Sequence, residues 1–241
     1  MAIARVGQIG STVDRFTDGS NQVTITVGVA GVAAGSTVVL AIGTNSATAT
    51  ITGIVDSNIN TYTVHKTQAN VGNVESSYLA SGDIDVALVN GDTITITFSS
   101  GVGVVAYADE WSGLAASPID RTASGNSGFG NSHTSGSTAT TTQADELLIG
   151  VHVHNQAATW TATSSFNLIH EGLGVTAGRR LAYQYRIVSA TGAYASTGTT
   201  DNNTDTANII GTFTAPAPPP QSFDGIGTFR TDRIRSRRTS W

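Results

Sequence analysis

The sequence contains no cysteine, one methionine and a single lysine among its 241 residues. Without cysteine the chain forms no disulfide, no thiolate zinc site and no thiol nucleophile. Only 12% of the residues are charged, and the 17 acidic side chains outnumber the 12 basic ones. This acidic balance argues against nucleic acid as the main partner. The composition leaves open whether the protein is an enzyme, a binding protein or a structural protein.

The sequence also lacks long apolar runs. None approaches the roughly 20 residues that are needed to span a bilayer, so we expect no membrane partner. The first residues, MAIARVGQIGSTVDRF, contain no apolar core of a signal peptide, and we expect a protein made in the cytoplasm without export. The apolar fraction is an ordinary 39%, which indicates a folded domain rather than a disordered chain.

Small hydroxyl side chains are abundant instead. Threonine accounts for 36 residues and serine for 24, so about a quarter of the chain carries a short hydroxyl group. Threonine is β-branched and favours strands, whereas serine and the 27 glycines favour turns. Because the strong helix formers glutamate, lysine, methionine and glutamine are scarce, the composition predicts an all-β fold.

Several segments have the residue pattern of β-strands. From Gln22 to Val29, valine and isoleucine alternate with threonine and glycine, as in a strand that is buried on one face only. Asp92 to Phe98 shows the same alternation. Longer apolar runs are typical of strands buried on both faces, and they occur at 37–42, 102–108 and 147–153. The pattern predicts an antiparallel sandwich or barrel of about a dozen strands.

Two stretches of the chain, residues 36–111 and 145–214, repeat one order of features. Each has an apolar strand, an Asn-Ala turn, a strand with histidine, a strand with tyrosine, a threonine-rich strand and a final apolar strand. We interpret them as two similar halves of one sandwich, with coincidence among β-rich segments as the alternative. The Ser/Gly/Thr-rich residues 117–142 would form the crossover between the halves, because so long a loop is unusual inside a compact domain.

Both ends of the chain lie outside this pattern. Residues 1–21 are expected to form an N-terminal arm before the sandwich at 22–214. The segment 215–241 begins with a Pro-rich spacer, which favours extended polyproline II and cannot enter a sheet. Its last 21 residues carry a net charge of +3, whereas residues 1–220 carry −8. An acidic body therefore bears a basic C-terminal arm on a stiff spacer.

The order of the segments resembles that of a known family. The pieces that carry the resemblance are GSTVVLAIGTNSATATITGIVDSNINTYTV, VVAYADEWSGLAASPIDRTASG, TTTQADELLIGVHV and RRLAYQYRIVSATGAYAST. They span roughly residues 35–214 and are similar to jelly-roll, concanavalin-like β-sandwich domains of tailed-phage structural proteins and bacterial surface proteins. The resemblance implies an antiparallel jelly-roll-type sandwich, to which the sequence adds extended N- and C-terminal arms. Such domains serve as capsid decoration proteins, tail-fibre modules and carbohydrate-binding modules, and no family motif assigns a site residue.

Two groups of residues have the chemistry of metal ligands. His152 and His154 lie two positions apart in an expected strand, so their side chains share a face. No third ligand is evident, and half-exposed strand residues are the favoured interpretation. A second group offers the oxygen ligands that Ca²⁺ prefers but lacks the EF-hand spacing, so that a solvated turn is favoured; it consists of Asp201, Asn202, Asn203 and Asp205. We predict no metal site.

Acidic pairs are candidates for glycoside hydrolysis, which needs two carboxylates about 5–10 Å apart. We expect the neighbouring acids to be solvated strand ends and turn caps; they are Asp83 with Asp85, Asp109 with Glu110, and Asp145 with Glu146. The sequence contains no nucleophile elbow, P-loop or dinucleotide fingerprint. We therefore predict no catalytic residue, no cofactor and no enzymatic activity.

The C-terminal arm is the most informative feature of the sequence. Arginine and tryptophan are enriched at the centres of protein interfaces, and apolar residues are interspersed among the arginines here. This mixture favours docking on a protein over a solvated tail, and both over nucleic acid. The residues predicted to bind the partner are Phe229, Arg230, Arg233, Ile234, Arg235, Arg237, Arg238 and Trp241.

Together these features predict a virion structural protein of a tailed bacteriophage. We expect a capsid decoration, or cement, protein that binds the major capsid protein on the capsid surface and stabilises the shell. We also expect a homo-oligomer, for which a trimer would suit local three-fold sites. The alternative is a glycan-binding module of a phage tail fibre or surface protein, which would use Trp111 or Trp160 to stack on sugar rings beside a loop-bound Ca²⁺. Against this, isolated tryptophans in strands are more often buried.

Overall fold

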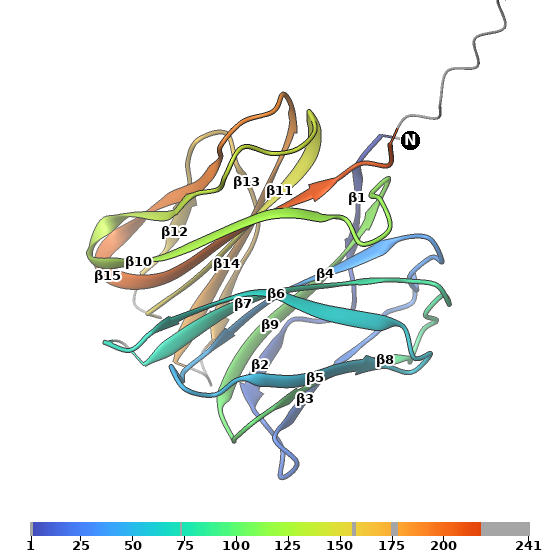
Figure 1. The fold of residues 1–241 in the computed structure, drawn as a ribbon. Coiled ribbons are helices and arrows are strands. Elements are labelled where there is room, and N and C mark those ends of the chain that lie inside the picture. The colour runs from blue at the N-terminus through green and yellow to red at the C-terminus, as the bar shows by residue number, and fades with distance from the viewer. Residues whose placement is uncertain (1, 73, 156–157, 175–177, 218–241) are drawn as a thin grey trace, which may run out of the picture.

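The computed structural model describes residues 2–72, 74–155, 158–174 and 178–217. The elements in this part of the chain are all β-strands, paired in antiparallel fashion, which confirms the all-β prediction. They form three sheets, which we call the small, central and C-terminal sheets (Figure 1). Within these residues, no helix is long and apolar enough to cross a membrane.

The central sheet has six strands in the order β1-β9-β4-β7-β6, with β2 also paired to β9. The strands are β1 (Ala4–Gln8), β2 (Val13–Phe16), β4 (Thr37–Thr44), β6 (Thr61–Asn70), β7 (Glu75–Asp83) and β9 (Gly103–Ser112). Because β1 and β2 are both paired to β9, the prediction that residues 1–21 form a separate arm is wrong. These residues extend one edge of the sheet.

The small sheet covers one face of the central sheet. Its order is β3-β8-β5, and the strands are β3 (Gln22–Thr26), β8 (Thr93–Phe98) and β5 (Ile51–Asp56). In β3, the buried Val23 and Ile25 alternate with more exposed polar neighbours, as the sequence pattern predicted. The strand ends three residues earlier than expected, however, and Val29 is 92% exposed rather than buried.

The C-terminal sheet has the order β10-β15-β11-β14-β13, with β12 also paired to β15. The strands are β10 (Ile119–Ser137), β11 (Asp145–Asn155), β12 (Trp160–Ala162), β13 (Asn167–Gly174), β14 (Arg179–Ser189) and β15 (Ala195–Thr214). β10 occupies most of the Ser/Gly/Thr-rich stretch that was expected to be a crossover loop. It pairs with β15 from end to end, which satisfies its backbone without apolar side chains.

The central sheet lies between the other two and is buried on both faces (Figure 1). In β4, Val38, Leu40 and Ile42 pack toward the small sheet. Val39 and Ala41 point the other way, into a second apolar core shared with the C-terminal sheet. The apolar run at 37–42 is therefore a doubly buried strand, as predicted. The jelly-roll sandwich is not confirmed, because the described strands form three stacked sheets rather than two.

The two large sheets share an order of strands. The spatial order β9-β4-β7-β6 in the central sheet matches β15-β11-β14-β13 in the C-terminal sheet. The corresponding strands also follow each other in the same order along the chain, and β9 and β15 come last in each half. Irregularities in pairing also correspond, since β6 and β13 each shift register once against their neighbour. This correspondence allows equivalent positions in the two halves to be compared.

Candidate functional site

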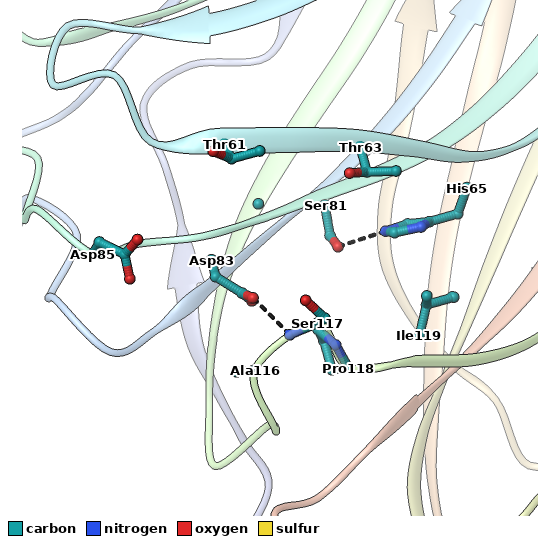
Figure 2. Close-up of a pocket in the computed structure, with 11 residues that line it drawn as sticks. Thr61, Thr63, His65, Ser81, Asp83, Asp85, Ala116, Ser117, Pro118 and Ile119 are labelled. Atoms are coloured by element: carbon teal, nitrogen blue, oxygen red, sulfur yellow. Dashed lines mark hydrogen bonds between the residues drawn. The ribbon is translucent and has the colours of Figure 1, made fainter.

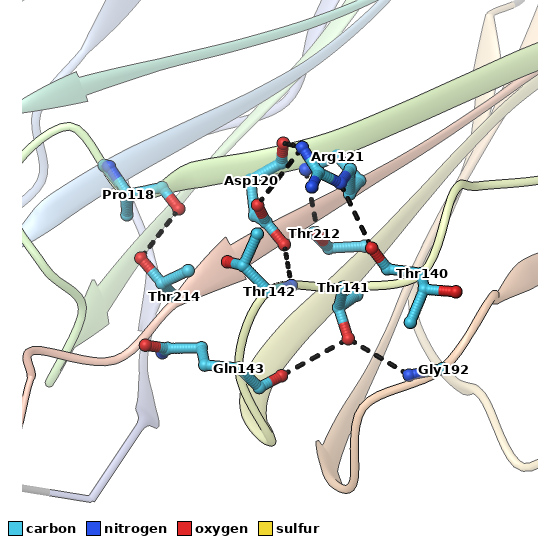
Figure 3. Close-up of polar contacts among 10 residues, drawn as sticks. All are labelled: Pro118, Asp120, Arg121, Thr140, Thr141, Thr142, Gln143, Gly192, Thr212 and Thr214. Carbon is cyan, nitrogen blue, oxygen red and sulfur yellow. Dashed lines mark hydrogen bonds and ion pairs between the residues drawn. The ribbon is translucent and has the colours of Figure 1, made fainter.

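The chain leaves the described body beside Pro118. The backbone N–H of Thr214, the last residue of β15, donates to the Pro118 carbonyl over 2.7 Å, and the Thr214 hydroxyl donates to the same oxygen over 3.2 Å (Figure 3). The next residue is held too, because the Ala215 N–H donates to the carbonyl of Asp145 (3.3 Å) and its own carbonyl accepts from the Gln143 amide (3.0 Å). The start of the C-terminal segment is therefore fixed to the body.

An acidic pair lies close to this exit. The Asp120 carboxylate accepts a 2.7 Å hydrogen bond from the backbone N–H of Thr142 and lies 3.6 Å from the Arg121 guanidinium (Figure 3). Arg121 also donates to the carbonyl of Thr140 (3.2 Å). Glu146 is fully buried near them, and burial together with the Asp120 carboxyl raises its pKa. The exit of the chain therefore lies beside two carboxyl groups, of which Asp120 is paired with Arg121.

A groove of about 500 Å³ opens on the other side of Pro118 (Figure 2). One wall is formed by the ends of β6 and β7, and the other by residues 116–119, which lead into β10. Polar side chains dominate the first wall; they are Thr61, Thr63 and His65 of β6 and Ser81 and Asp83 of β7. Among the described residues that line the groove, none is a lysine or arginine.

The polar groups of the groove are held by short contacts. The Ser81 hydroxyl lies 2.7 Å from His65 Nε2, and burial lowers the pKa of His65, so the ring is neutral at pH 7 (Figure 2). The Asp83 carboxylate accepts a 2.6 Å hydrogen bond from the backbone N–H of Ser117 and a weaker one from the Thr37 hydroxyl (3.4 Å). These contacts fix the depth and width of the groove.

A small residue of β7, Ser81, lines the groove. Ser81 lies opposite Val39 in the central sheet, as Tyr185 lies opposite Ile149 in the C-terminal sheet. The ring of Tyr185 packs edge-on against Trp111 at 5.2 Å. The serine side chain is far smaller than tyrosine, and the groove lies between β7 and the segment at 116–119.

Next to the groove lies a surface that we call the apolar end patch. It consists of four exposed apolar side chains on three neighbouring loops, namely Val29, Ile59, Val86 and Val89, which are 92%, 89%, 54% and 62% exposed. The loops are tied together, because Val32 and Leu88 exchange backbone hydrogen bonds. The four exposed apolar side chains therefore stand on or beside loops whose backbones are held together by hydrogen bonds.

The patch and the groove share a segment of chain. The Asn60 side chain accepts hydrogen bonds from the backbone N–H groups of Asp85 and Val86 (2.9 Å each) and donates to the Val86 carbonyl (2.9 Å). Asn60 precedes Thr61 of the groove wall, and Asp85 itself lines the groove. Through Pro118, Asp85 and Asn60, the chain exit, the groove and the apolar end patch are therefore neighbours, and we call this region the exit end.

The two histidines considered as metal ligands have a different role. His152 and His154 share a face of β11 as predicted, but both are fully buried, so the half-exposed interpretation is wrong. The Trp160 ring stacks on His152 at 4.2 Å between ring centroids. His152 Nδ1 lies 2.9 Å from Asn208 Oδ1, and its Nε2 lies 2.8 Å from the Ser196 hydroxyl. Burial lowers the pKa of His152 to about 3.

Ser196, His152 and Asn208 are arranged in the order of a nucleophile, a base and an orienting group, but solvent does not reach them. Ser196, His152 and Asn208 are each fully buried, beneath Trp160 and the part of the β10–β15 pair that folds back over the sheet. A nucleophile must reach its substrate. The array therefore acts as a satisfied polar core of the C-terminal half.

The remaining candidates are accounted for individually. The Asp/Asn cluster is part of β15 rather than a separate turn, at a stretch where pairing with β10 shifts register, and the Asp201 carboxylate accepts from the N–H of Thr159 (2.7 Å). Buried Asp109 binds Arg5 (2.6 Å), and Glu110 accepts from the Ser36 hydroxyl (2.7 Å). In the part of the chain that the structure covers, no three His, Asp or Glu side chains gather as a metal site would require.

Both tryptophans in the body are buried, which removes them as exposed stacking residues for sugars. The eight residues predicted to bind a partner lie outside the described residues; they are Phe229, Arg230, Arg233, Ile234, Arg235, Arg237, Arg238 and Trp241. The sequence carries no local signal of the groove or the apolar end patch, because each is assembled from segments that are distant in sequence. Comparison with protein families, curated proteins and solved structures finds no match to this chain.

Proposed function

We propose that this chain is a virion structural protein of a tailed bacteriophage, which binds the major capsid protein as a decoration protein on the capsid surface. The observation that carries the proposal is the exit end, where the apolar end patch and the start of the basic C-terminal segment lie together. The resemblance of residues 35–214 to domains of phage structural proteins points to the class of partner. We further propose a homo-oligomer, with a trimer as the arrangement that suits a local three-fold site.

The chemistry of the exit end fits binding to a protein. Burying the four side chains of the apolar end patch removes apolar surface from water at about 25 cal/mol per Å². The loops beneath them are already fixed by the Val32–Leu88 and Asn60 contacts, so little conformational entropy is lost when the patch is covered. The C-terminal arginines would add charged contacts with carboxylates of the shell.

Cosedimentation with capsids of the virus that encodes this chain tests the proposal. Val29→Asp combined with Ile59→Asp places charge in the apolar end patch and should weaken capsid binding by about tenfold or more. Val71→Asp is the matched control, because Val71 is 76% exposed at the opposite end of β6. Equal capsid affinity for both variants and the wild type, or no binding by the wild type, would contradict the proposal.

The glycan-binding alternative has one observation in its favour. The groove presents hydroxyl and carboxylate groups at a size that fits a sugar, although the two body tryptophans are buried and cannot stack on it. A glycan array with added Ca²⁺ separates the two functions. Specific sugar binding that is lost in Asp83→Asn would favour the alternative over capsid decoration.

A further inference from the structure

We infer that the groove at the exit end is a guanidinium-binding site, and that in the free protein an arginine of the chain's own C-terminal segment occupies it. The inference concerns the protein before any capsid is present and does not depend on the proposed function. It is carried by three observations on the described residues, which are the charge of the groove, its shape and its distance from the point where the chain leaves the body.

The groove has uncompensated negative charge. Asp83 and Asp85 line it, and within the described part of the chain neither takes part in an ion pair. The hydrogen bonds that Asp83 accepts come from the neutral donors Ser117 N–H and Thr37 hydroxyl, so its charge is retained. A guanidinium, which is always charged and donates in a planar fork, is suited to such carboxylates.

The cations available to the groove are concentrated in the C-terminal segment. Residues 221–241 hold five of the 12 basic side chains of the protein. At least four of the seven basic side chains in the body already pair with body carboxylates; these pairs are Arg5–Asp109, Arg121–Asp120, Arg179–Glu75 and Arg180–Glu171. After these ion pairs, the charge that remains on the body is mainly negative, opposite in sign to the C-terminal arginines.

The shape of the groove fits a flat group with an apolar stem. Ser81 lines the groove and takes up little of its volume, because its side chain is small. Pro118 and Ile119 supply apolar surface on the second wall of the groove, beside Ser117, which is bonded to Asp83 (Figure 2). An arginine side chain has both properties, because its methylene stem packs on apolar surface and its planar head binds carboxylate.

The position of the exit favours the protein's own segment over that of a second copy. Pro118 lines the groove and also accepts both hydrogen bonds from Thr214. Twelve residues separate Ala217 from Arg230, enough to span about 40 Å when extended and to return to the groove when bent. A short tether of this kind gives an effective concentration on the order of millimolar, far above that of a second copy in dilute solution.

The absence of cysteine allows a clean test by disulfide trapping in the full chain. Thr63→Cys places a thiol on the exposed rim of the groove, and Ser236→Cys places one between two arginines without removing a charge. Ser100→Cys with Ser236→Cys is the matched control, because Ser100 is exposed in the turn between β8 and β9 at the opposite end of the molecule. Both double-cysteine variants are oxidised with glutathione disulfide at micromolar protein concentration. Their products are then separated under non-reducing conditions.

We expect an intramolecular disulfide to form about tenfold faster in the Thr63 pair than in the Ser100 pair. Asp83→Asn with Asp85→Asn, or 0.5 M salt, should remove most of this difference, since both weaken attraction between guanidinium and carboxylate. The inference would be overturned by equal rates for the two pairs or by a disulfide-linked dimer as the main product. It would also be overturned if neither the aspartate substitutions nor salt changed the rate of the Thr63 pair. Since no capsid is present, failure here leaves the cosedimentation result unaffected.

Discussion

The carboxylate of Asp83 accepts a 2.6 Å hydrogen bond from the backbone N–H of Ser117, and this contact joins the central sheet to the segment that leads into the C-terminal sheet. Ser117 has a positive φ of 51°, which is uncommon for a residue with a side chain. The hydrogen bond holds the chain in that conformation. It shapes the groove and positions the adjacent Pro118, to which Thr214 is bonded.

Removal of this carboxylate should loosen the exit end. Asp83→Ala leaves the Ser117 N–H without its acceptor and should lower the free energy of unfolding by about 1–2 kcal/mol. Asp83→Asn keeps an acceptor oxygen and should cost less. Urea denaturation provides the measurement, with Asp85→Ala as the control because Asp85 is exposed. A cost for Asp83→Ala no larger than that of the control would show that the contact contributes little.

The buried histidine predicts how stability depends on acid. His152 has an ordinary pKa of 6.5 when unfolded and about 3 when folded, because burial disfavours the charged ring. Between these values the unfolded state binds more protons, so stability falls as pH decreases from 6.5 toward 3. His65, His133 and His170 act in the same direction, since burial lowers the pKa of each.

His152→Gln isolates this contribution. The variant is expected to be less stable at pH 7, because it loses the stacking on Trp160, but its stability should fall less steeply with acid. The difference in slope can reach about 1.4 kcal/mol per pH unit, which corresponds to one proton. Urea titrations between pH 4 and 6.5 measure both slopes. Identical slopes would mean that His152 does not remain neutral in the folded protein.

Glu146 predicts the opposite dependence. Burial and the neighbouring Asp120 raise its pKa above the ordinary 4.5, so the stability associated with its neutral form is present below 4.5 and lost as pH rises through the folded value. Glu146→Gln keeps the neutral shape and, in urea denaturation, should raise the free energy of unfolding at pH 8 by on the order of 1 kcal/mol or more, with little effect at pH 4. Asp145→Asn, an exposed neighbour, is the control and should change neither value.

Close packing around Trp160 gives a further prediction. A Cβ atom added at Gly198 would lie 2.1 Å from the indole ring, so Gly198→Ala must displace the ring that covers His152. We expect a loss of about 1–3 kcal/mol in urea denaturation. Gly128→Ala serves as the comparison, because nothing lies within 4 Å of a Cβ built there. Equal stability of the two variants would contradict the packing described here.

The sequence predicted strands and their buried faces correctly where burial produces a local pattern of apolar residues. The continuous apolar run in β4 predicted a strand that is buried on both faces, and the alternation around Val23 predicted a strand buried on one. Val29 continues that alternation but is exposed, because the chain turns at Gly31, whose φ is +68° and whose N–H bonds to the carbonyl of Gly28. The alternation of apolar and polar residues therefore continues three residues past the end of β3.

Long-range pairing explains what the sequence did not predict. β10 has few apolar residues, and its strand depends on pairing with β15, whose residues lie about 60 to 90 positions further along the chain. The groove joins Asp83 to Ser117 across 34 positions, and no local spacing signals such a contact. The burial of His152 likewise depends on the fold of β12 and β15 over the outer face of β11.

A cryo-electron microscopy reconstruction of capsids carrying this protein tests the central proposal most directly. We expect density for the three-sheet body on the outer capsid surface, with Val29, Ile59 and the start of the C-terminal segment facing the major capsid protein. Capsids without such density at saturating protein, or bodies attached through the opposite end near Val71, would contradict it.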